Sequence, residues 1–285
     1  KESFQLMWNN FKELFTSINE RISHYDTILL PKVCEKLALK KGFSICIPGM
    51  EEKDEKIEYI QSTLQVLNTQ QRPRCVTIFG NSGLKVKFLL KGNEDLRLDK
   101  RFMQFFSLIN SLLNKTKIKR EYGASIEEYS IIPLAPNVGL VRWLTGSDTI
   151  HQIICEMRNL LEISQTIEYD ILTDFCGNMT SMLSYPQKLE TYYVINEQTQ
   201  GNEIKDFLWV RAPNASTWFL HSSLFCITTA LMSMIGYVIG LGDRHPSNIM
   251  IQRETGKVIH IDFADSFESA INRENFPEKV PLRLK

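Results

Sequence analysis

The chain has 285 residues, with 33 basic and 33 acidic side chains and a formal net charge of zero. This length allows one large or two medium domains with a substantial core, and the balanced charge favours neither nucleic acid nor an acidic membrane as a partner. Six scattered cysteines form no Cys-x-x-Cys pair, and the first residues do not read as a secretory signal. We therefore expect reduced thiols and a cytoplasmic protein, with the nucleus or the periphery of internal membranes as alternatives.

The first predicted element is an amphipathic helix over residues 4–22. Trp8, Phe11, Phe15 and Ile18 recur at spacings of three and four residues, which places them on one helix face. We expect this face to pack on neighbouring elements.

Two predicted strands, residues 75–79 and 84–90, are joined by the turn Gly-Asn-Ser-Gly at residues 80–83. Alone, this pattern is typical of an ordinary hairpin, but a glycine-rich turn also lets backbone N–H groups approach phosphate oxygens. Lys91 follows an apolar run at the end of the second strand, where a buried ammonium needs a charged partner. That lysine favours the phosphate interpretation of the turn.

The middle of the chain alternates helical and extended patterns. Residues 101–113 predict a helix, residues 114–125 a polar, lysine-rich and disordered loop, and residues 129–133 and 139–144 two further strands. Residues 150–207 are helical in pattern but contain no recognisable catalytic motif.

A stretch without charged residues covers residues 224–242 and is almost long enough to cross a bilayer. It contains Thr228, Thr229 and Ser233 and runs directly into a polar loop at Asp243. We therefore prefer a buried core helix over a membrane span.

The richest chemistry follows this stretch, in Gly-Leu-Gly-Asp-Arg-His-Pro-Ser-Asn at residues 240–248 and Ile-His-Ile-Asp-Phe at residues 259–263. Two apolar runs around a Glu-Thr-Gly-Lys turn separate the motifs and predict a short hairpin, which would bring Asn248 close to Asp262. Carboxylate and amide oxygens can hold magnesium, and an acidic or imidazole group can handle a hydroxyl proton. Asp243, His245, Asn248 and Asp262 thus provide the side chains of a phosphoryl-transfer site.

Taken together, these motifs resemble the phosphatidylinositol-3-kinase-related protein kinases. Residues 91–97 (Lys-Gly-Asn-Glu-Asp-Leu-Arg), residues 208–210 (Leu-Trp-Val) and the tail at residues 276–284 (Phe-Pro-Glu-Lys-Val-Pro-Leu-Arg-Leu) are similar to the target-of-rapamycin (TOR) branch. The resemblance implies an α+β, bilobal PI3/PI4-kinase-type catalytic domain with a small β-rich N-lobe and a larger helical C-lobe. Residues 1–28 would be the end of a rapamycin-binding four-helix domain, residues 29–142 the N-lobe, and residues 143–285 the hinge and a C-lobe that we expect to be truncated.

The resemblance also implies roles for individual residues. Asp243 would orient or deprotonate the substrate hydroxyl with help from His245, while Asn248 and Asp262 would bind Mg²⁺, or Mn²⁺ in its place. Lys91 would contact the ATP phosphates, with Glu94 or Asp99 as its carboxylate partner. The expected ATP-binding residues are Gly80, Ser82, Gly83, Leu89, Lys91, Glu94, Asp99, Tyr129, Val141, Trp143, Leu144, Met250 and Ile261.

Substrate and activity leave alternatives. Residues 262–285 carry five acidic and four basic side chains and form no cationic segment for inositol phosphates. A Ser/Thr protein kinase in growth or stress signalling, with protein substrates and regulatory subunits, is therefore preferred over a phosphoinositide kinase. Because Ala264 replaces the usual glycine and the C-lobe is expected to be incomplete, a nucleotide-binding, pseudokinase-like scaffold is the competing interpretation.

Overall fold

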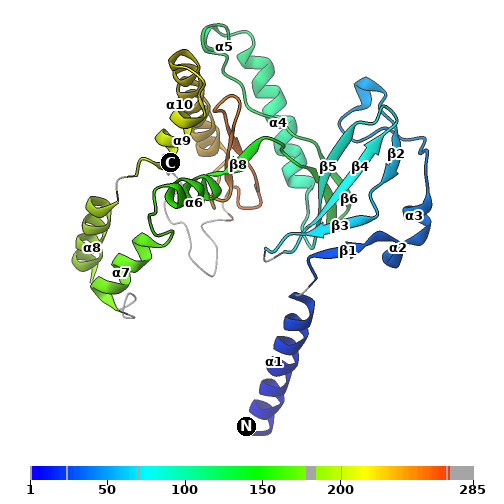
Figure 1. Ribbon diagram of the computed structural model, residues 1–285, viewed down its shortest axis with the longest axis horizontal. Coiled ribbons are helices and arrows are strands. Elements are labelled where there is room, and N and C mark those ends of the chain that lie inside the picture. Colours follow the sequence, from blue (N-terminus) through cyan, green and yellow to red (C-terminus); the bar gives the residue numbers. More distant parts are fainter. Residues whose placement is uncertain are drawn as a thin grey trace. The chain divides into compact units, whose positions relative to one another are not determined.

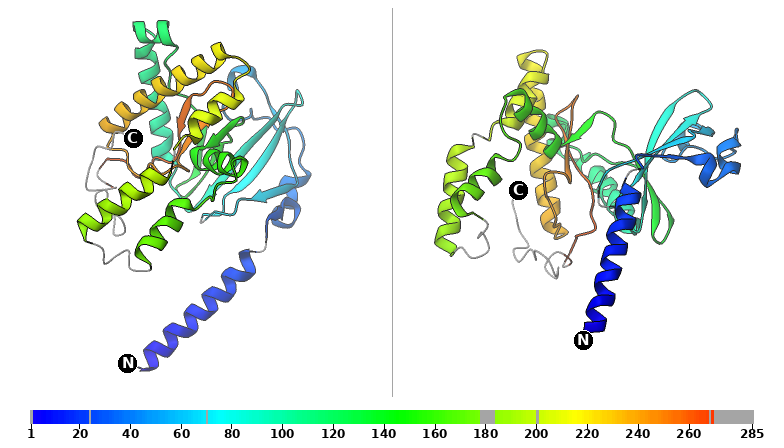
Figure 2. Two further views of the ribbon diagram at one scale, coloured as in Figure 1. Left: turned by 60° about the vertical axis from the view of Figure 1, so that its left-hand side comes forward. Right: turned by 60° about the horizontal axis from the view of Figure 1, so that its bottom comes forward.

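The computed structural model describes residues 2–23, 25–69, 71–177, 184–199, 201–267 and 269. The chain folds into two compact units (Figures 1 and 2). Unit 1 comprises residues 1–105 and 128–144, and unit 2 comprises residues 106–127 and 145–285. Each unit has its own apolar core.

Unit 1 is built on an antiparallel sheet with the strand order β1-β3-β4-β5-β7-β6, in which β2 also pairs with β4. Val76, Ile78, Val86 and Phe88 fill one face of the two central strands and form the core with the segments before β2. The elements are α1 (Glu2–Ser23), β1 (Thr27–Leu29), α2 (Leu30–Val33), α3 (Glu35–Leu39), η1 (Glu51–Lys53), β2 (Ile57–Ile60), β3 (Thr63–Val66), β4 (Arg74–Gly80), β5 (Lys85–Gly92), β6 (Ile131–Ala135) and β7 (Val138–Arg142). Helix α4 (Arg97–Leu113) contributes residues to both units.

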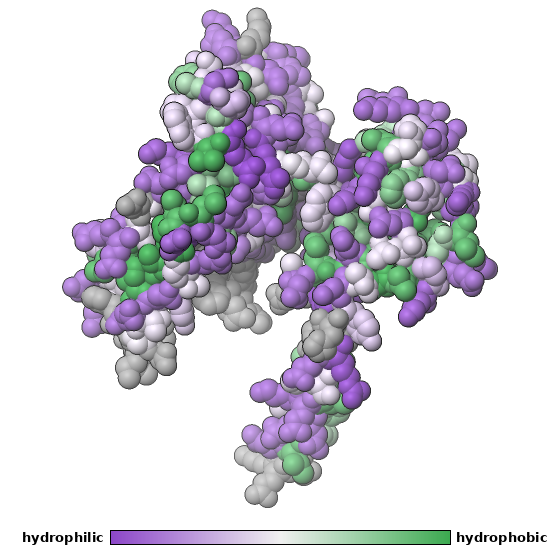
Figure 3. Space-filling view, in the orientation of Figure 1, coloured by the Kyte–Doolittle hydropathy of each residue, from purple (hydrophilic) through white to green (hydrophobic). Residues whose placement is uncertain are grey.

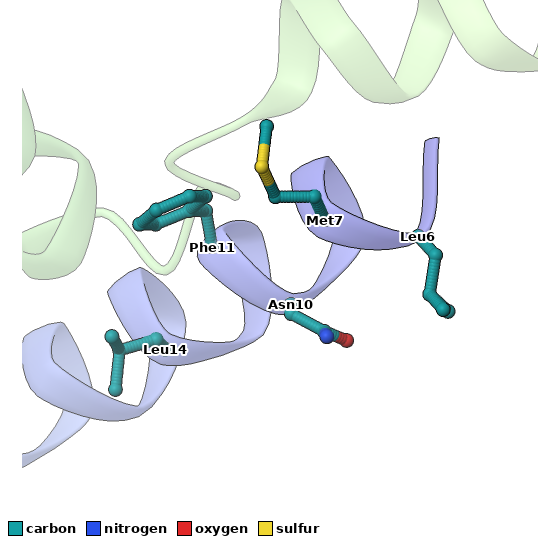
Figure 4. A pocket seen from close by; sticks show the side chains of 5 residues that line it. All are labelled: Leu6, Met7, Asn10, Phe11 and Leu14. Carbon is teal, nitrogen blue, oxygen red and sulfur yellow. The ribbon is translucent and has the colours of Figure 1, made fainter. Parts of the chain in front are cut away.

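The apolar face of α1 is exposed. Trp8, Phe11 and Phe15 each leave more than half of their surface accessible, and apolar side chains are visible along this helix in Figure 3. A hollow on the helix is lined only by its own residues, as Figure 4 shows: Leu6, Met7, Asn10, Phe11 and Leu14. The predicted helix is confirmed, but the described chain does not cover its apolar face as we expected.

Unit 2 combines helices with a three-stranded antiparallel sheet of order β10-β9-β8. Its core joins Ile153 and Met157 to Phe207, Leu208 and Ile251. The elements are α5 (Lys117–Tyr122), β8 (Ser147–Thr149), α6 (Ile150–Leu160), α7 (Ile167–Cys176), α8 (Tyr185–Gln198), α9 (Glu203–Arg211), α10 (Ala215–Val238), β9 (Ile249–Gln252) and β10 (Val258–His260).

Helix α5 corrects the prediction of a disordered loop at residues 114–125. The Thr116 side chain accepts a hydrogen bond from the Lys119 N–H at the start of α5, and Gly123 ends the helix with a φ of +67°. A capping threonine and a glycine in the left-handed region are standard helix boundaries. The lysine-rich composition concealed these two local signals.

Helix α10 lies where the uncharged stretch predicted a helix, although it begins earlier. His221, Thr228, Met232 and Ile235 are buried, whereas Phe219, Met234 and Tyr237 are exposed, so the helix is buried on one side only. Within the described chain, α10 is the one helix long and apolar enough to span a membrane, and a single such helix is weak support for a span.

Candidate active site

The hairpin between the two polar motifs is confirmed. Strands β9 and β10 pair with His260 opposite Ile249, and the Ile261 N–H donates a hydrogen bond to the Asn248 carbonyl at 3.0 Å. Asp262 follows Ile261 directly, so the hairpin brings Asn248 and Asp262 to neighbouring positions at its open end. This is the proximity that a shared ion would need.

Both candidate catalytic aspartates have unusual backbone conformations. Asp243 has a φ of +55° and Asp262 a φ of +60°. Residues other than glycine adopt this left-handed region at an energetic cost and are concentrated at functional sites. The Asn248 side-chain amide donates to the Asp243 carbonyl oxygen at 3.0 Å and approaches Asp243 Oδ2 at 3.4 Å. These bonds connect the candidate metal ligand to the candidate catalytic residue.

His245 lies within the same loop. The Ser247 N–H donates to His245 Nδ1 at 3.2 Å, so in the neutral ring the proton is assigned to Nε2. That Nε2 atom is 3.9 Å from Asp243 Oδ2. His245 and Asp243 are both partly exposed, and their arrangement is suited to passing a proton between a bound hydroxyl and the loop.

Arg244 supports the loop, a role that the sequence analysis did not assign. It is buried, and its guanidinium donates to the main-chain carbonyl oxygens of Gly242, Asn248, Ile261 and Asp262. One side chain therefore ties the first polar motif to the second. A charged residue between two candidate catalytic residues was the available signal, but its carbonyl partners are distant in sequence.

The hairpin is attached to α10 at two points. The buried Thr228 hydroxyl donates to the Leu224 carbonyl and accepts from the Val258 N–H at 3.0 Å. A Cβ at Gly256 would lie 2.6 Å from the His221 carbonyl oxygen, so the turn of the hairpin approaches α10 too closely for a side chain. Helix α10 thus fixes the hairpin that carries the polar motifs.

The candidate nucleotide residues of unit 1 share a sheet face. Leu89 pairs with Val141, and Lys91 pairs with Gly139, so Leu89, Lys91 and Val141 point to the same side. The core residues Phe88 and Val86 alternate with them and point to the other side. Register therefore separates a candidate nucleotide face from the core face of the sheet.

Lys91 has a carboxylate partner, as its position predicted. Its ammonium is 2.8 Å from Glu94 Oε2, and both side chains are mostly buried. Asp99 is buried in the first turn of α4. The geometry therefore pairs Lys91 with Glu94, the first of the two carboxylates that the sequence suggested.

The remaining predicted residues have varied surroundings. Tyr129 is buried, Leu144 is half-buried, and Trp143 is partly exposed while its N–H donates to the Lys87 carbonyl at 2.9 Å. In unit 2, Met250 pairs with Ile259, whose alternation places Ile261 on the same face of the hairpin.

Backbone N–H groups in the turn at residues 80–83 already have partners inside unit 1. Asn81 donates to the Lys56 carbonyl, Ser82 to a Glu55 carboxylate oxygen and Gly83 to the Gly80 carbonyl. The predicted contact between these N–H groups and phosphate would therefore require the turn to change. The Ser82 side chain is exposed.

The oxygen donors of unit 2 fit magnesium. In the described residues, no group of three or more His, Cys, Asp and Glu side chains could hold a metal ion. Magnesium in kinases is typically held by one or two protein oxygens together with substrate phosphates. Asn248 and Asp262 match this requirement, because the Asn248 nitrogen faces Asp243 and leaves its amide oxygen as a possible ligand.

A β-rich unit with a paired lysine and a helical unit with polar motifs at the end of a hairpin together define a bilobal α+β kinase fold. The chain belongs to the phosphatidylinositol 3- and 4-kinase family, whose model matches residues 85–285. Within this family it fits the TOR branch. It is 40% identical to the Serine/threonine-protein kinase TOR of Arabidopsis thaliana and 38% identical to the Serine/threonine-protein kinase mTor of Drosophila melanogaster, each over 97% of this chain. Identity to the Serine/threonine-protein kinase SMG1 of Danio rerio is lower, at 26%.

Solved structures support the same fold. A complete CtTel1 dimer matches 80% of this chain and 9% of its own with a TM-score of 0.69 and 26% identity. The family implies the use of ATP. The chain spans about 11% of the length of the TOR relatives from Arabidopsis and Drosophila.

Proposed function

We propose that this chain contains the catalytic residues of an ATP-dependent Ser/Thr protein kinase of the TOR type, acting in growth or stress signalling. The observation that carries this proposal is the hydrogen-bonded arrangement of Asp243 and Asn248 next to Asp262, built by the hairpin and tied by Arg244. Phosphoryl transfer depends mainly on positioning and electrostatic stabilisation, and this arrangement provides both.

Each residue has a defined task in the proposal. Asp243 orients the substrate hydroxyl and accepts its proton, and His245 Nε2, 3.9 Å from the Asp243 carboxylate, assists that transfer. Asn248 and Asp262 hold Mg²⁺, or Mn²⁺ in its place, which neutralises charge on the ATP phosphates. The Asn248 amide nitrogen is oriented by the Asp243 carbonyl, so loss of either residue would disturb both tasks.

Unit 1 binds the nucleotide in this proposal. Lys91, oriented by Glu94, contacts the phosphates, while Asp99 supports this charged group. Leu89 and Val141 offer an apolar face to the adenine ring, and Trp143 stacks on it. The remaining nucleotide contacts in the proposal come from Gly80, Ser82, Gly83, Tyr129, Leu144, Met250 and Ile261.

Protein hydroxyls are the proposed acceptors. The relatives named Ser/Thr protein kinases favour protein over lipid, and the acidic and basic side chains of residues 262–285 are balanced. We also propose regulatory subunits as partners and a cytoplasmic location, with the nucleus and internal membranes as alternatives. The tail motif at residues 276–284 lies outside the described residues.

An acceptor comparison tests the proposal. The chain is incubated with Mg²⁺ and γ-labelled ATP in the presence of a generic Ser/Thr protein, phosphatidylinositol vesicles or no acceptor. Label on serine or threonine that depends on Asp243 supports the protein kinase. Label on the lipid would favour the lipid kinase, and ATP binding without transfer would favour the scaffold.

A further inference from the structure

Residues 55–56 hold the turn at residues 80–83 from one side. Glu55 Oε1 accepts a hydrogen bond from the Ser82 N–H at 2.9 Å. Lys56 and Asn81 are joined by two bonds, from the Asn81 N–H to the Lys56 carbonyl at 3.0 Å and from the Lys56 N–H to Asn81 Oδ1 at 3.2 Å. The turn is therefore fixed by contacts from outside its own hairpin.

Glu55 is 8% exposed, an uncommon position for a carboxylate. A Cβ built on Gly80 would lie 2.0 Å from Glu55 Oε1, so the carboxylate occupies the space that a side chain at residue 80 would take. Glycine at this position is thus required by Glu55 and not by an unusual φ angle.

The Glu55 carboxylate lies on the core side of the sheet. Gly80 alternates with Ile78, which belongs to the core cluster, so both face the same side of β4. Leu89 and Lys91 point to the opposite side, because their neighbour Phe88 faces the core. Glu55 therefore supports the turn from behind and does not occupy the candidate nucleotide face.

We propose that Glu55 is a positioning residue for the nucleotide-binding turn: its carboxylate holds the Ser82 N–H and fixes the turn before the ATP phosphates arrive. This inference rests on the proposed function. A turn that is already ordered loses less conformational freedom when a ligand binds. Removal of Glu55 should therefore weaken nucleotide binding without slowing the chemical step, because the catalytic carboxylates belong to unit 2.

Four variants test the role of the carboxylate. Glu55→Ala removes the acceptor, whereas Glu55→Gln keeps an oxygen for the Ser82 N–H. Gly80→Ala places a methyl group where the carboxylate lies and should displace it. Glu52→Ala is a matched control, because Glu52 is exposed in the nearby η1 segment.

The measurements are MgADP affinity, the KM for ATP, kcat and the unfolding temperature. We expect Glu55→Ala and Gly80→Ala to raise the Kd for MgADP and the KM for ATP about three- to tenfold with kcat within twofold. Glu55→Gln and Glu52→Ala should stay close to the parent protein. The double variant Glu55→Ala/Gly80→Ala should be no weaker than Glu55→Ala, because both changes remove the same contact.

Separate outcomes distinguish this inference from the proposed function. Unchanged MgADP affinity in Glu55→Ala, or tighter binding in Glu55→Gln, would overturn the positioning role while leaving the kinase proposal intact. If Glu55→Ala does not fold, Gly80→Ala and Glu55→Gln decide the question. A parent protein that binds no nucleotide would overturn both proposals.

Discussion

The Asn248 side-chain amide donates a hydrogen bond to the Asp243 carbonyl oxygen at 3.0 Å. The candidate metal ligand and the candidate catalytic aspartate are therefore coupled through the protein itself. The main-chain carbonyl of the same Asn248 accepts from Ile261, the residue before Asp262. Asn248 connects both polar motifs.

Replacement of Asn248 by alanine should impair metal use and catalysis together. We expect Asn248→Ala to lower kcat at least about tenfold and to raise the Mg²⁺ concentration for half-maximal activity, since an oxygen ligand and a loop hydrogen bond are lost. A magnesium titration of phosphate transfer measures both effects. Asn196→Ala, at an exposed position on α8, is the control and should behave as the parent protein. An unchanged magnesium requirement would contradict the ligand role of Asn248.

Arg244→Lys should destabilise unit 2. Lysine cannot reproduce the guanidinium contacts with several carbonyl oxygens, and each buried acceptor left without a donor costs about 1–3 kcal/mol. Urea unfolding followed by circular dichroism should give a loss of about 2 kcal/mol or more. Arg101→Lys, at an exposed position on α4, serves as the control. Equal stability of the two variants would show that Arg244 does not hold the loop.

Thr228→Val should weaken the attachment of the hairpin to α10. Valine preserves the shape of the side chain but leaves the buried Val258 N–H without its acceptor, which costs about 1–3 kcal/mol. Thr229→Val is a matched control on the same helix, because the Thr229 hydroxyl bonds within α10 to the Phe225 carbonyl. Thermal unfolding should separate the two variants. Equal effects would assign the loss to the helix and not to the hairpin.

The Arg158 cluster predicts a pH-dependent stability. Arg158 is buried and bonds Glu168 and Glu203, and its hydrogen bond with Glu168 lowers the pKa of that carboxyl below its ordinary value of 4.5. A lowered pKa in the folded state means that the stabilisation is complete above about pH 4.5 and disappears as the pH falls through the folded value.

Glu168→Gln tests this pH dependence. The variant should be less stable than the parent at pH 7, and the difference should shrink as the pH falls below 4.5. Chemical unfolding at a series of pH values measures it. Glu162→Gln, at an exposed position nearby, should show no such trend. A difference that stays constant down to pH 3 would contradict the assignment to Glu168.

Local patterns predicted much of the fold. Apolar runs around a Gly-containing turn were enough to predict the hairpin between Asn248 and Asp262, and an ammonium after a buried run predicted a carboxylate partner for Lys91. In α5, by contrast, a lysine-rich composition outweighed the capping signals of Thr116 and Gly123. Patterns that depend on neighbours in sequence were thus the most reliable when no composition bias opposed them.

Interactions between distant residues were not predictable in the same way. Arg244 bonds carbonyl oxygens up to 18 residues away, and Glu55 bonds Ser82 across 27 residues. Backbone acceptors and donors carry no sequence identity, so the residue type alone does not reveal such partners. The exposed face of α10 was missed for a related reason, because an uncharged helix reads as buried whichever side its neighbours cover.

The most direct test of the kinase proposal is transfer of labelled γ-phosphate to a Ser/Thr protein by the parent chain, Asp243→Ala and Asp262→Ala, with ATP binding measured in parallel. We predict that Asp243→Ala binds ATP but transfers at least about a hundredfold more slowly, and that Asp262→Ala loses the magnesium-dependent part of both. Transfer by Asp243→Ala at the parent rate would contradict the central role of the Asp243 loop.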